Sequence, residues 1–208
     1  MYVAPSVGAV RALWDRSGLL AGPVIREQLS QFAEALVDAY AAGQRSADVL
    51  LRNWSDGGED ELRSAGTLSL RLARSVVARD HGFTAWSSVE GECDATFELA
   101  VDAVVHGRIN DLSALLADHP DLPARRSAYG HRATLLHYTA ANGVEIRRQV
   151  VPANAAEVVV ALLDAGGDRS AKLHAYGGDF DALAMLKTSA HPHDAGVAAG
   201  VEQLLAMN

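Results

Sequence analysis

The chain contains a single cysteine, Cys93, among 208 residues. One cysteine excludes an intrachain disulfide and every zinc motif that is built on several cysteines. Long apolar runs are also missing: no stretch of about 18 apolar residues occurs, and Arg11, Asp15 and Arg16 interrupt the first segment. Neither a membrane span nor a signal peptide is expected, and these absences favour a cytoplasmic protein.

Positive charge is scarce as well. The 18 Lys and Arg face 26 Asp and Glu, which gives a formal net charge of -8, and the basic residues form no run. Such a chain is not expected to bind a nucleic-acid backbone or an anionic membrane. No P-loop, G-x-G-x-x-G or G-x-S-x-G motif occurs, and the two glycines of "YGGDFD" are too few to hold a pyrophosphate. We therefore expect no cofactor.

Amphipathic helices dominate what is present. In "PVIREQLSQFAEALVDAYAAG", residues 23–43, apolar residues recur every three or four positions, as on one face of a helix: Ile25, Leu29, Phe32, Leu36 and Tyr40. Pro23 suits the first turn of this helix and Gly43 its end. A second helix is expected over 67–82, with Gly82 as the residue that ends it.

The connections around these helices carry weaker signals. Residues 55–61, "SDGGEDE", are expected to form an acidic loop. Thr84 is a candidate N-cap for a short helix in which Trp86 and Val89 are buried. The alanine-rich sequence favours helix throughout, and no strand is predicted.

The second half of the chain contains internal repeats. "AYGHRATLLHYTAANG" at 128–143 aligns without gaps with "AYGGDFDALAMLKTSA" at 175–190. A second apolar helix follows each copy, "EVVVALLDAGGD" in one case and "GVAAGVEQLLAMN" in the other. A weaker copy lies at 97–122, where Gly107 corresponds to Gly143. The repeated unit is helix, tight turn, helix, loop.

These segments resemble the ankyrin repeat. "TLLHYTAANGVE", residues 134–145, is similar to the family pattern T-P-L-H-x-A-A-x-x-G-H-x-E, and "EVVVALLDAGGD" is similar to E-V-V-x-L-L-L-x-x-G-A-D. "ARDHGFTAWSSVEGE" resembles a segment that precedes such repeats in some bacterial proteins. The resemblance implies an all-α fold, with an N-terminal helical segment over 1–92 and about three degenerate ankyrin-like repeats over 93–208. We expect the two parts to share one core.

The resemblance also implies structural roles for three residues. Thr134 and His137 would hydrogen-bond backbone groups at the turn and link neighbouring repeats, and Asp181 would cap the corresponding helix of the third repeat. A departure from the pattern is more informative about function. About ten residues, 147–156, are inserted between the two helices of the second repeat, and a long insert beside a groove resembles a lid.

Ankyrin arrays bind partners through variable positions on the first helix of each repeat. Transferred by the repeat offsets, these positions predict that one groove is lined by Asp102, His106, Tyr138, Asn142, Met185 and Ser189. Asp102 and His106 are four residues apart and share one helix face. If the protein is an enzyme, His106 would act as general acid or base, Asp102 would orient it and Tyr138 would be the opposing proton donor. The alternative is a solvated pair and a tyrosine that contacts a partner.

A second polar cluster includes Tyr176, Asp179 and His191 as candidate binding residues. His191 and His193 could ligate zinc, but the spacing of the cluster supports no metal site and none is predicted. Two functions stay open. The groove could bind a protein or peptide partner, or it could hold a small metabolite for a cofactor-independent acid/base enzyme of the dehydratase, isomerase or cyclase class.

Overall fold

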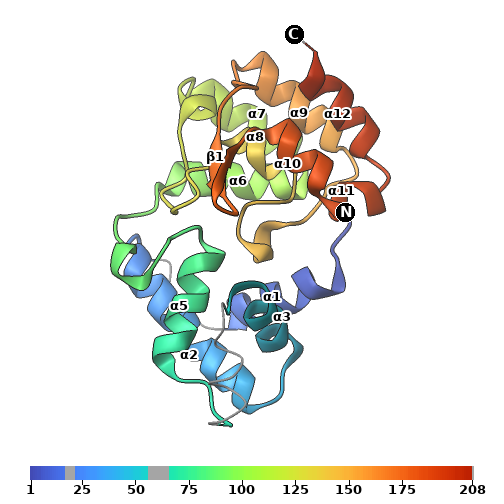
Figure 1. Ribbon diagram of the computed structural model, residues 1–208. Coiled ribbons are helices and arrows are strands. Elements are labelled where there is room, and N and C mark those ends of the chain that lie inside the picture. The colour runs from blue at the N-terminus through green and yellow to red at the C-terminus, as the bar shows by residue number, and fades with distance from the viewer. Residues whose placement is uncertain (17–21, 56–65, 208) are drawn as a thin grey trace.

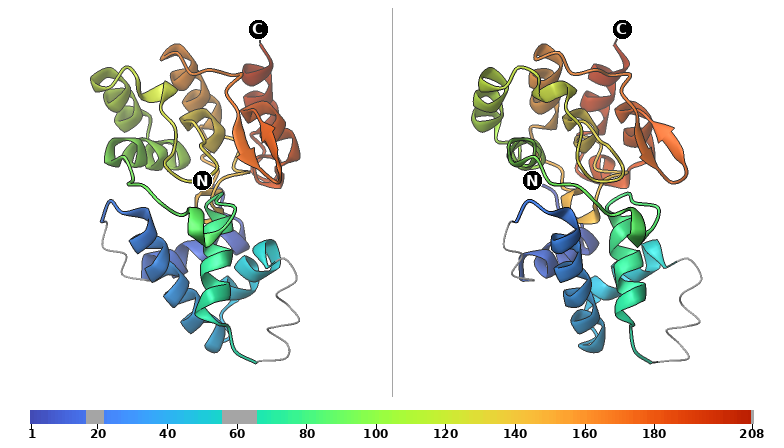
Figure 2. Two further views of the ribbon diagram at one scale, coloured as in Figure 1. Left: turned by 60° about the vertical axis from the view of Figure 1, so that its left-hand side comes forward. Right: turned by 90° about the vertical axis from the view of Figure 1, so that its left-hand side faces the viewer.

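The computed structural model describes residues 1–16, 22–55 and 66–207, and it is mostly helical (Figure 1). Residues 56–61 of the expected acidic loop lie outside these ranges. The chain forms two lobes, of which the lower one contains the first helices and the upper one the second half of the chain (Figure 2). The helices of the lower lobe are α1 (Pro5–Arg16), α2 (Ile25–Ala41), α3 (Arg45–Trp54) and α5 (Leu70–Asp80).

Helix α2 has the amphipathic face that its sequence predicts. Ile25, Leu29, Phe32 and Leu36 are fully buried, and Tyr40 is half-buried. The helix begins at Ile25, so Pro23 precedes it and does not lie in its first turn. It ends at Ala41, and Gly43 follows with a left-handed φ of 62° that a residue with a side chain rarely adopts.

The segment after α5 differs from the expectation in one respect. Gly82 does follow the end of α5, with φ 76°. Thr84, however, caps no helix, because the next element is the short 3-10 helix η1 (Trp86–Ser88). The hydroxyl of Ser88 hydrogen-bonds the backbone of Ala85 and stabilises this turn instead. Val89 is buried as expected, and Trp86 is only half-buried.

The upper lobe contains three pairs of helices. Helix α6 contacts α8 and α8 contacts α10, whereas α7 contacts α9 and α9 contacts α12, so the pairs stack in two layers. The elements are α6 (Ala95–His106), α7 (Ile109–Asp118), η2 (Leu122–Ala124), α8 (Leu135–Tyr138), α9 (Ala155–Asp164), α10 (Ala182–Thr188), α11 (Ala190–Asp194) and α12 (Ala198–Ala206).

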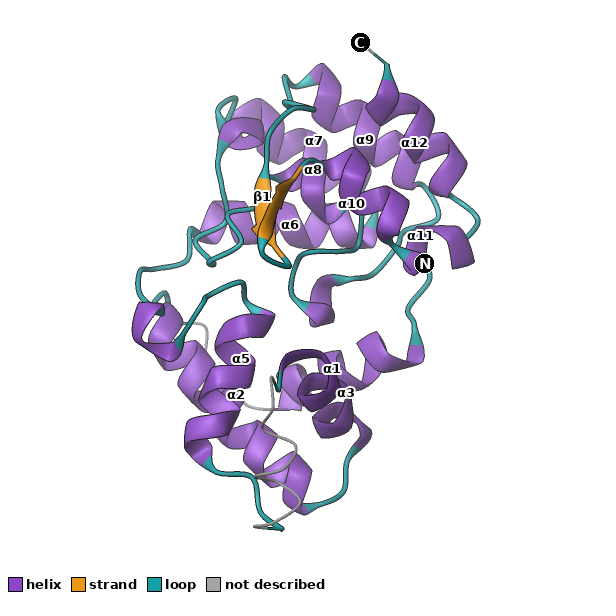
Figure 3. Ribbon diagram, in the orientation of Figure 1, coloured by secondary structure: helices purple, strands orange, loops and turns teal. Residues whose placement is uncertain are grey.

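A β-hairpin interrupts the helices, although the sequence predicted no strand. Strands β1 (Leu173–Ala175) and β2 (Gly178–Phe180) pair antiparallel (Figure 3). The two residues of the turn, Tyr176 and Gly177, have φ values of 51° and 76°. Positive φ at both central residues is typical of the tight hairpin turn, but tyrosine is rare there and three-residue strands are too short for a periodic pattern.

The 147–156 insert is part of the core. Its first residues continue the 3-10 helix η3 (Ile146–Arg148), which packs on α1, and Val151 pairs with Tyr2 through backbone hydrogen bonds of 2.7 and 3.0 Å. Val150 and Val151 are each 1% exposed. The expected lid is therefore a buried segment that joins the two lobes.

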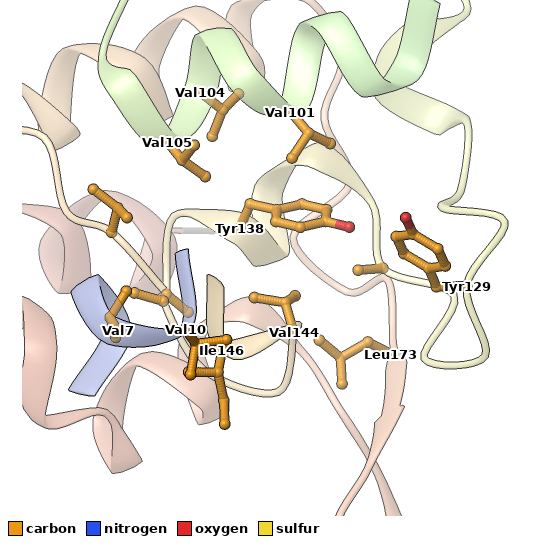
Figure 4. Close-up of a cluster of buried hydrophobic side chains, with 14 of the residues drawn as sticks. Val7, Val10, Val101, Val104, Val105, Tyr129, Tyr138, Val144, Ile146 and Leu173 are labelled. Carbon is orange, nitrogen blue, oxygen red and sulfur yellow. The ribbon is translucent and has the colours of Figure 1, made fainter. Parts of the chain in front are cut away.

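Buried apolar residues of both lobes belong to one cluster. Figure 4 shows Val7 and Val10 of α1 beside Ile146, below Val105 of α6. The two regions that the sequence separates near residue 93 thus share apolar packing. No helix within the described ranges has the length and apolar character that a membrane span requires.

Candidate functional site

Asp102 and His106 lie together on α6, as their spacing predicts. Nδ1 of His106 is 2.8 Å from the carbonyl oxygen of Asp102 and 3.0 Å from its Oδ1. The Arg11 guanidinium lies 3.1 Å from Nε2 of His106. Because a guanidinium only donates hydrogen bonds, Nε2 accepts this one and the ring proton of the neutral imidazole is on Nδ1. Both ring nitrogens of His106 therefore already have partners.

Asp102 has a second cationic partner. Its Oδ2 accepts a 2.5 Å hydrogen bond from Arg108, which also donates to Asp111 at 2.8 Å. Burial raises the pKa of Asp102, but the hydrogen bond from Arg108 and the charge of that arginine outweigh it and hold the pKa below its usual value. Asp102 is thus a carboxylate in an ion-paired surface network.

Tyr138 does not face this pair. Its side chain is 1% exposed and packs against the rings of Phe97 and His131, at centroid distances of 6.4 and 6.1 Å. Figure 4 shows the ring among valines, with its hydroxyl turned toward Tyr129. Burial raises the pKa of the Tyr138 hydroxyl well above its usual value. The expectation that Tyr138 lines an open groove is wrong, because all four residues of α8 are buried.

Asn142, Met185 and Ser189 meet at the junction of the second and third helix pairs. Nδ2 of Asn142 donates to Thr188 Oγ1 at 2.9 Å, and Ser189 Oγ donates to the carbonyl oxygen of Ala141 at 3.2 Å. Met185 and Ser189 are 2% and 5% exposed. Ser189 thus helps to hold the helix pairs together, whereas Asn142 and Met185 line a surface pocket of about 410 Å³ together with Tyr176, Phe180, Ala184 and Thr188.

The second expected cluster is divided between two places. Tyr176 donates its hydroxyl to Asn142 Oδ1 at 2.8 Å, and its ring stacks on Trp54 of the other lobe with centroids 6.2 Å apart. Asp179 pairs with His174 across the hairpin at 2.9 Å. His191 instead lies on α11 beside the ring of Tyr2, with centroids 6.4 Å apart. Tyr176 and Asp179 share the hairpin, and His191 is not part of that group.

Thr134, His137 and Asp181 make the contacts that the ankyrin resemblance implies. His137 Nδ1 accepts a hydrogen bond from the backbone N–H of Thr134 at 3.1 Å, and His137 Nε2 donates to the carbonyl oxygen of Ala171 at 3.1 Å. Asp181 Oδ1 accepts from the backbone N–H of Ala184 at 2.8 Å and caps α10. Burial lowers the pKa of His137 to about 4, so the ring is neutral at pH 7.

A buried charge cluster that the sequence did not predict lies at the lobe boundary. Glu145 is completely buried and pairs with Arg148 at 3.0 Å, with His131 at 3.3 Å and with Arg147 at 3.6 Å. Arg148 also forms an ion pair with Glu98. Burial raises the pKa of Glu145, but the charges of Arg148 and Arg147 outweigh it, and the pKa stays well below its usual value. The available signal was "VEIRRQVV", in which charged residues alternate with apolar ones.

A cavity of about 620 Å³ opens beside this cluster, between the two lobes. A volume of this size suits a small-molecule ligand. Among its lining residues, Asp102 alone was expected in a site. The walls come from the lower lobe, from α6 and from the insert: Trp14, Gly22, Pro23, Gln28, Cys93, Ala95, Glu98, Leu99, Asp102, Tyr129, Arg147 and Arg148.

Metal coordination is not suggested by the described part of the chain, where no group of three or more His, Cys, Asp or Glu side chains is arranged to hold an ion.

Comparisons of the chain with models of known protein families, with curated proteins and with solved structures found no match.

Proposed function

We propose that this protein binds a small molecule in the cavity between its two lobes. The repeats expected from the sequence would be the three helix pairs of the upper lobe, arranged as in ankyrin proteins, and the lower lobe would close their inner face. The lone cysteine, which permits no intrachain disulfide, supports the cytoplasm as the proposed compartment.

The cavity itself is the observation that supports this proposal. Ligand sites are typically clefts of about 300–1,000 Å³ with apolar walls and a few convergent polar groups. Here about 620 Å³ lies next to Arg147 and Arg148, which are 8% and 9% exposed. Arginines with so little exposure at the wall of a cavity are unusual, because a desolvated charge must be compensated by partners.

The burial of Tyr138, Met185 and Ser189 is the reason for preferring a small ligand to a protein partner. An extended partner would need these side chains on an accessible face, and each is at most 5% exposed. A protein or peptide partner stays the alternative, and the exposed Tyr176 at the hairpin would be its natural contact.

An acid/base enzyme is a weaker alternative. A general base needs a free nitrogen within hydrogen-bond distance of the substrate. Nε2 of His106 is occupied by Arg11, and the side chain of Tyr138 is only 1% exposed. Binding of a small molecule in the cavity, without a reaction, is therefore the function that we propose.

The experiment is a screen of a chemically varied metabolite library for compounds that raise the melting temperature of the protein, followed by calorimetry. Leu99 is 59% exposed at the cavity wall, so Leu99→Trp should reduce the cavity volume without unfolding the chain. Val160→Trp is the matched control, since Val160 is 40% exposed on α9, outside the cavity. We expect Leu99→Trp to weaken binding at least tenfold and Val160→Trp to leave it unchanged. Binding that is indifferent to Leu99→Trp would show that the cavity is not the site.

A further inference from the structure

We infer that the ligand is a small organic acid with one carboxylate and an apolar body, and that Arg147 binds the carboxylate. This inference rests on the proposed function, since it names the class of molecule that the cavity would hold. The supporting observations are the different ion pairing of Arg147 and Arg148, the apolar part of the cavity wall and the fixed acidic groups nearby.

Arg148 has no capacity for a further anion. It forms ion pairs with Glu98 and with Glu145, the latter at 3.0 Å. Two carboxylates on one guanidinium satisfy its charge and most of its donors. This arginine therefore has a structural role: it joins α6 to the insert.

Arg147 is paired much less completely. Its closest approach to Glu145 is 3.6 Å, beyond a good hydrogen bond, and its terminal nitrogen Nη2 donates to the neutral hydroxyl of Tyr129 at 3.2 Å. Nε of Arg147 is buried and has no hydrogen-bond partner among the described residues. Arg147 is thus a desolvated cation whose donors are not all used.

The geometry around Arg147 favours recognition in the plane of its guanidinium. Cζ of Arg147 lies 3.8 Å from the ring centroid of Trp14, so the indole covers one face. Stacking leaves the edges of the guanidinium for hydrogen bonds, and a planar guanidinium edge matches the two oxygens of a carboxylate. An anion at this edge would give the guanidinium of Arg147 the close hydrogen-bonded partner that Glu145 does not provide.

The other polar groups of the wall are already engaged. Gln28 donates to the carbonyl oxygen of Gly22 at 2.5 Å, and its Oε1 lies 3.5 Å from the hydroxyl of Tyr129 and 3.8 Å from Sγ of Cys93. Apart from the arginines and two acidic residues, the remaining wall is apolar, with the exposed side chain of Leu99 at its edge. One anionic group and an apolar body are what such a cavity can accommodate.

A ligand with one negative charge suits this cavity better than a ligand with two. Glu98 and Asp102 also line the cavity, and both are acidic groups paired with arginines. Their charges would repel a dianion such as a phosphate monoester more strongly than a monoanion. A monocarboxylate balances the one incompletely paired arginine without adding excess negative charge.

The test measures dissociation constants by titration calorimetry for phenylacetate, its neutral amide, phenethylamine and phenyl phosphate. These compounds share an aromatic ring and differ in charge. We expect phenylacetate to bind at least tenfold more tightly than the other three. If the amide, the amine or phenyl phosphate binds as tightly as phenylacetate, the inference is wrong.

Two pairs of variants locate the interaction. Arg147→Gln should weaken phenylacetate binding tenfold to about a hundredfold, as expected for a lost charged hydrogen bond, and Arg125→Gln is the control because Arg125 pairs with Asp94 and Asp121 outside the cavity. If Arg147→Gln does not fold, Leu99→Glu serves in its place. A carboxylate at the cavity edge should weaken phenylacetate binding, and Leu99→Gln should not.

The outcomes separate this inference from the proposed function. One outcome is that neutral or cationic library compounds bind, that Leu99→Trp removes this binding, and that phenylacetate does not bind. The cavity is then a binding site, but its ligand is not an acid. If phenylacetate binds equally to the parent protein, Arg147→Gln and Leu99→Glu, Arg147 is not the recognition group.

Discussion

Asp80 Oδ1 accepts a hydrogen bond from the backbone N–H of Ile146 at 3.2 Å and another from the indole N–H of Trp54 at 3.1 Å. The last residue of α5 in the lower lobe thereby holds the first residue of η3 in the upper lobe. The carboxyl is 2% exposed, and its Oδ2 has no hydrogen-bond partner among the described residues. One buried carboxyl group thus contributes to the contact between the two lobes.

This contact makes stability depend on pH. Burial raises the pKa of Asp80 to about 7, and the charge of Glu145 adds to this, while the hydrogen bond from Ile146 and the charge of Arg147 oppose it. The folded protein then binds the proton more tightly than the unfolded chain does. The contribution of Asp80 to stability is fully present below pH 4 and is lost as the pH rises from about 4 to about 7.

Asp80→Asn should remove this contribution. Two buried histidines act in the opposite direction, because burial lowers the pKa of His81 to about 3 and that of His137 to about 4. The difference between Asp80→Asn and the parent protein isolates the carboxyl. Measured by urea unfolding, the free energy of unfolding of the variant minus that of the parent should increase by more than about 1 kcal/mol from pH 4.5 to pH 8. An equal difference at both pH values would contradict the assignment.

The contact of Gly82 with the upper lobe gives a second prediction. A Cβ at Gly82 would lie 2.3 Å from the backbone nitrogen of His131, whereas a Cβ at Gly43 would meet nothing within 4 Å. Both glycines have left-handed φ, so replacing either by alanine carries a backbone cost of about 1 kcal/mol. Gly82→Ala should lower the free energy of unfolding by at least about 2 kcal/mol more than Gly43→Ala, measured by urea titration. Equal losses would mean that the two lobes do not approach each other at Gly82.

The buried ion pairs of Glu145 give a third prediction. Glu145→Gln keeps the shape of the side chain and leaves Arg147 and Arg148 without their buried carboxylate. Removing one partner of a buried pair costs about 3–5 kcal/mol. The matched variant is Asp179→Asn, which breaks an exposed pair with His174 and should change stability by less than about 1 kcal/mol. Thermal unfolding of both variants checks this, and similar melting temperatures would refute it.

The hydrogen bonds of His137 give a fourth prediction. His137→Ala leaves the N–H of Thr134 and the carbonyl oxygen of Ala171 without their side-chain partner, at a cost of about 1–3 kcal/mol. His174→Ala, at an exposed hairpin position, should cost much less. Any loss of ligand binding in His137→Ala should follow its loss of folding. A variant with normal melting but no binding would overturn the structural assignment of His137.

Local signals in the sequence were sufficient for the helical class and for the buried face of α2, because periodicity acts over a few residues. The structural role of His137 was expected from the resemblance to the ankyrin pattern, since its partner Ala171 is 34 residues away. The hairpin at Tyr176 was missed because its strands are three residues long and a tyrosine occupies a turn position that usually needs glycine or asparagine. Tyr138 was misplaced for another reason. The repeat offset identifies equivalent positions, but whether they are open depends on which segments pack on them.

The cavity could not be predicted from local patterns. Its walls come from residues as far apart as Trp14 and Arg148, and only the packing of α1 against η3 brings them together. The charged alternation around Glu145 was visible in the sequence, but burial of those charges depends on partners that lie more than 40 residues away, such as Glu98. Asp102 was identified because the repeat offset transferred a groove position to it, and its spacing of four residues from His106 put both on one helix face.

The pair of Arg11 and His106 gives the last prediction and separates a structural role from a catalytic one. Arg11 of α1 donates to the carbonyl oxygen of Arg147 at 3.1 Å and contacts Nε2 of His106 at the same distance. His106→Ala removes one of these two partners and should lower the free energy of unfolding by about 1 kcal/mol. Arg11→Ala should also destabilise, and the double variant should lose less than the sum of the two single losses, because the second change finds the contact already broken. Urea unfolding of the four proteins measures this coupling.

For an acid/base catalyst, His106→Ala would instead leave stability unchanged and reduce turnover about 10²–10⁴-fold. Additive losses of stability would show that the two side chains do not interact and would leave His106 free for chemistry.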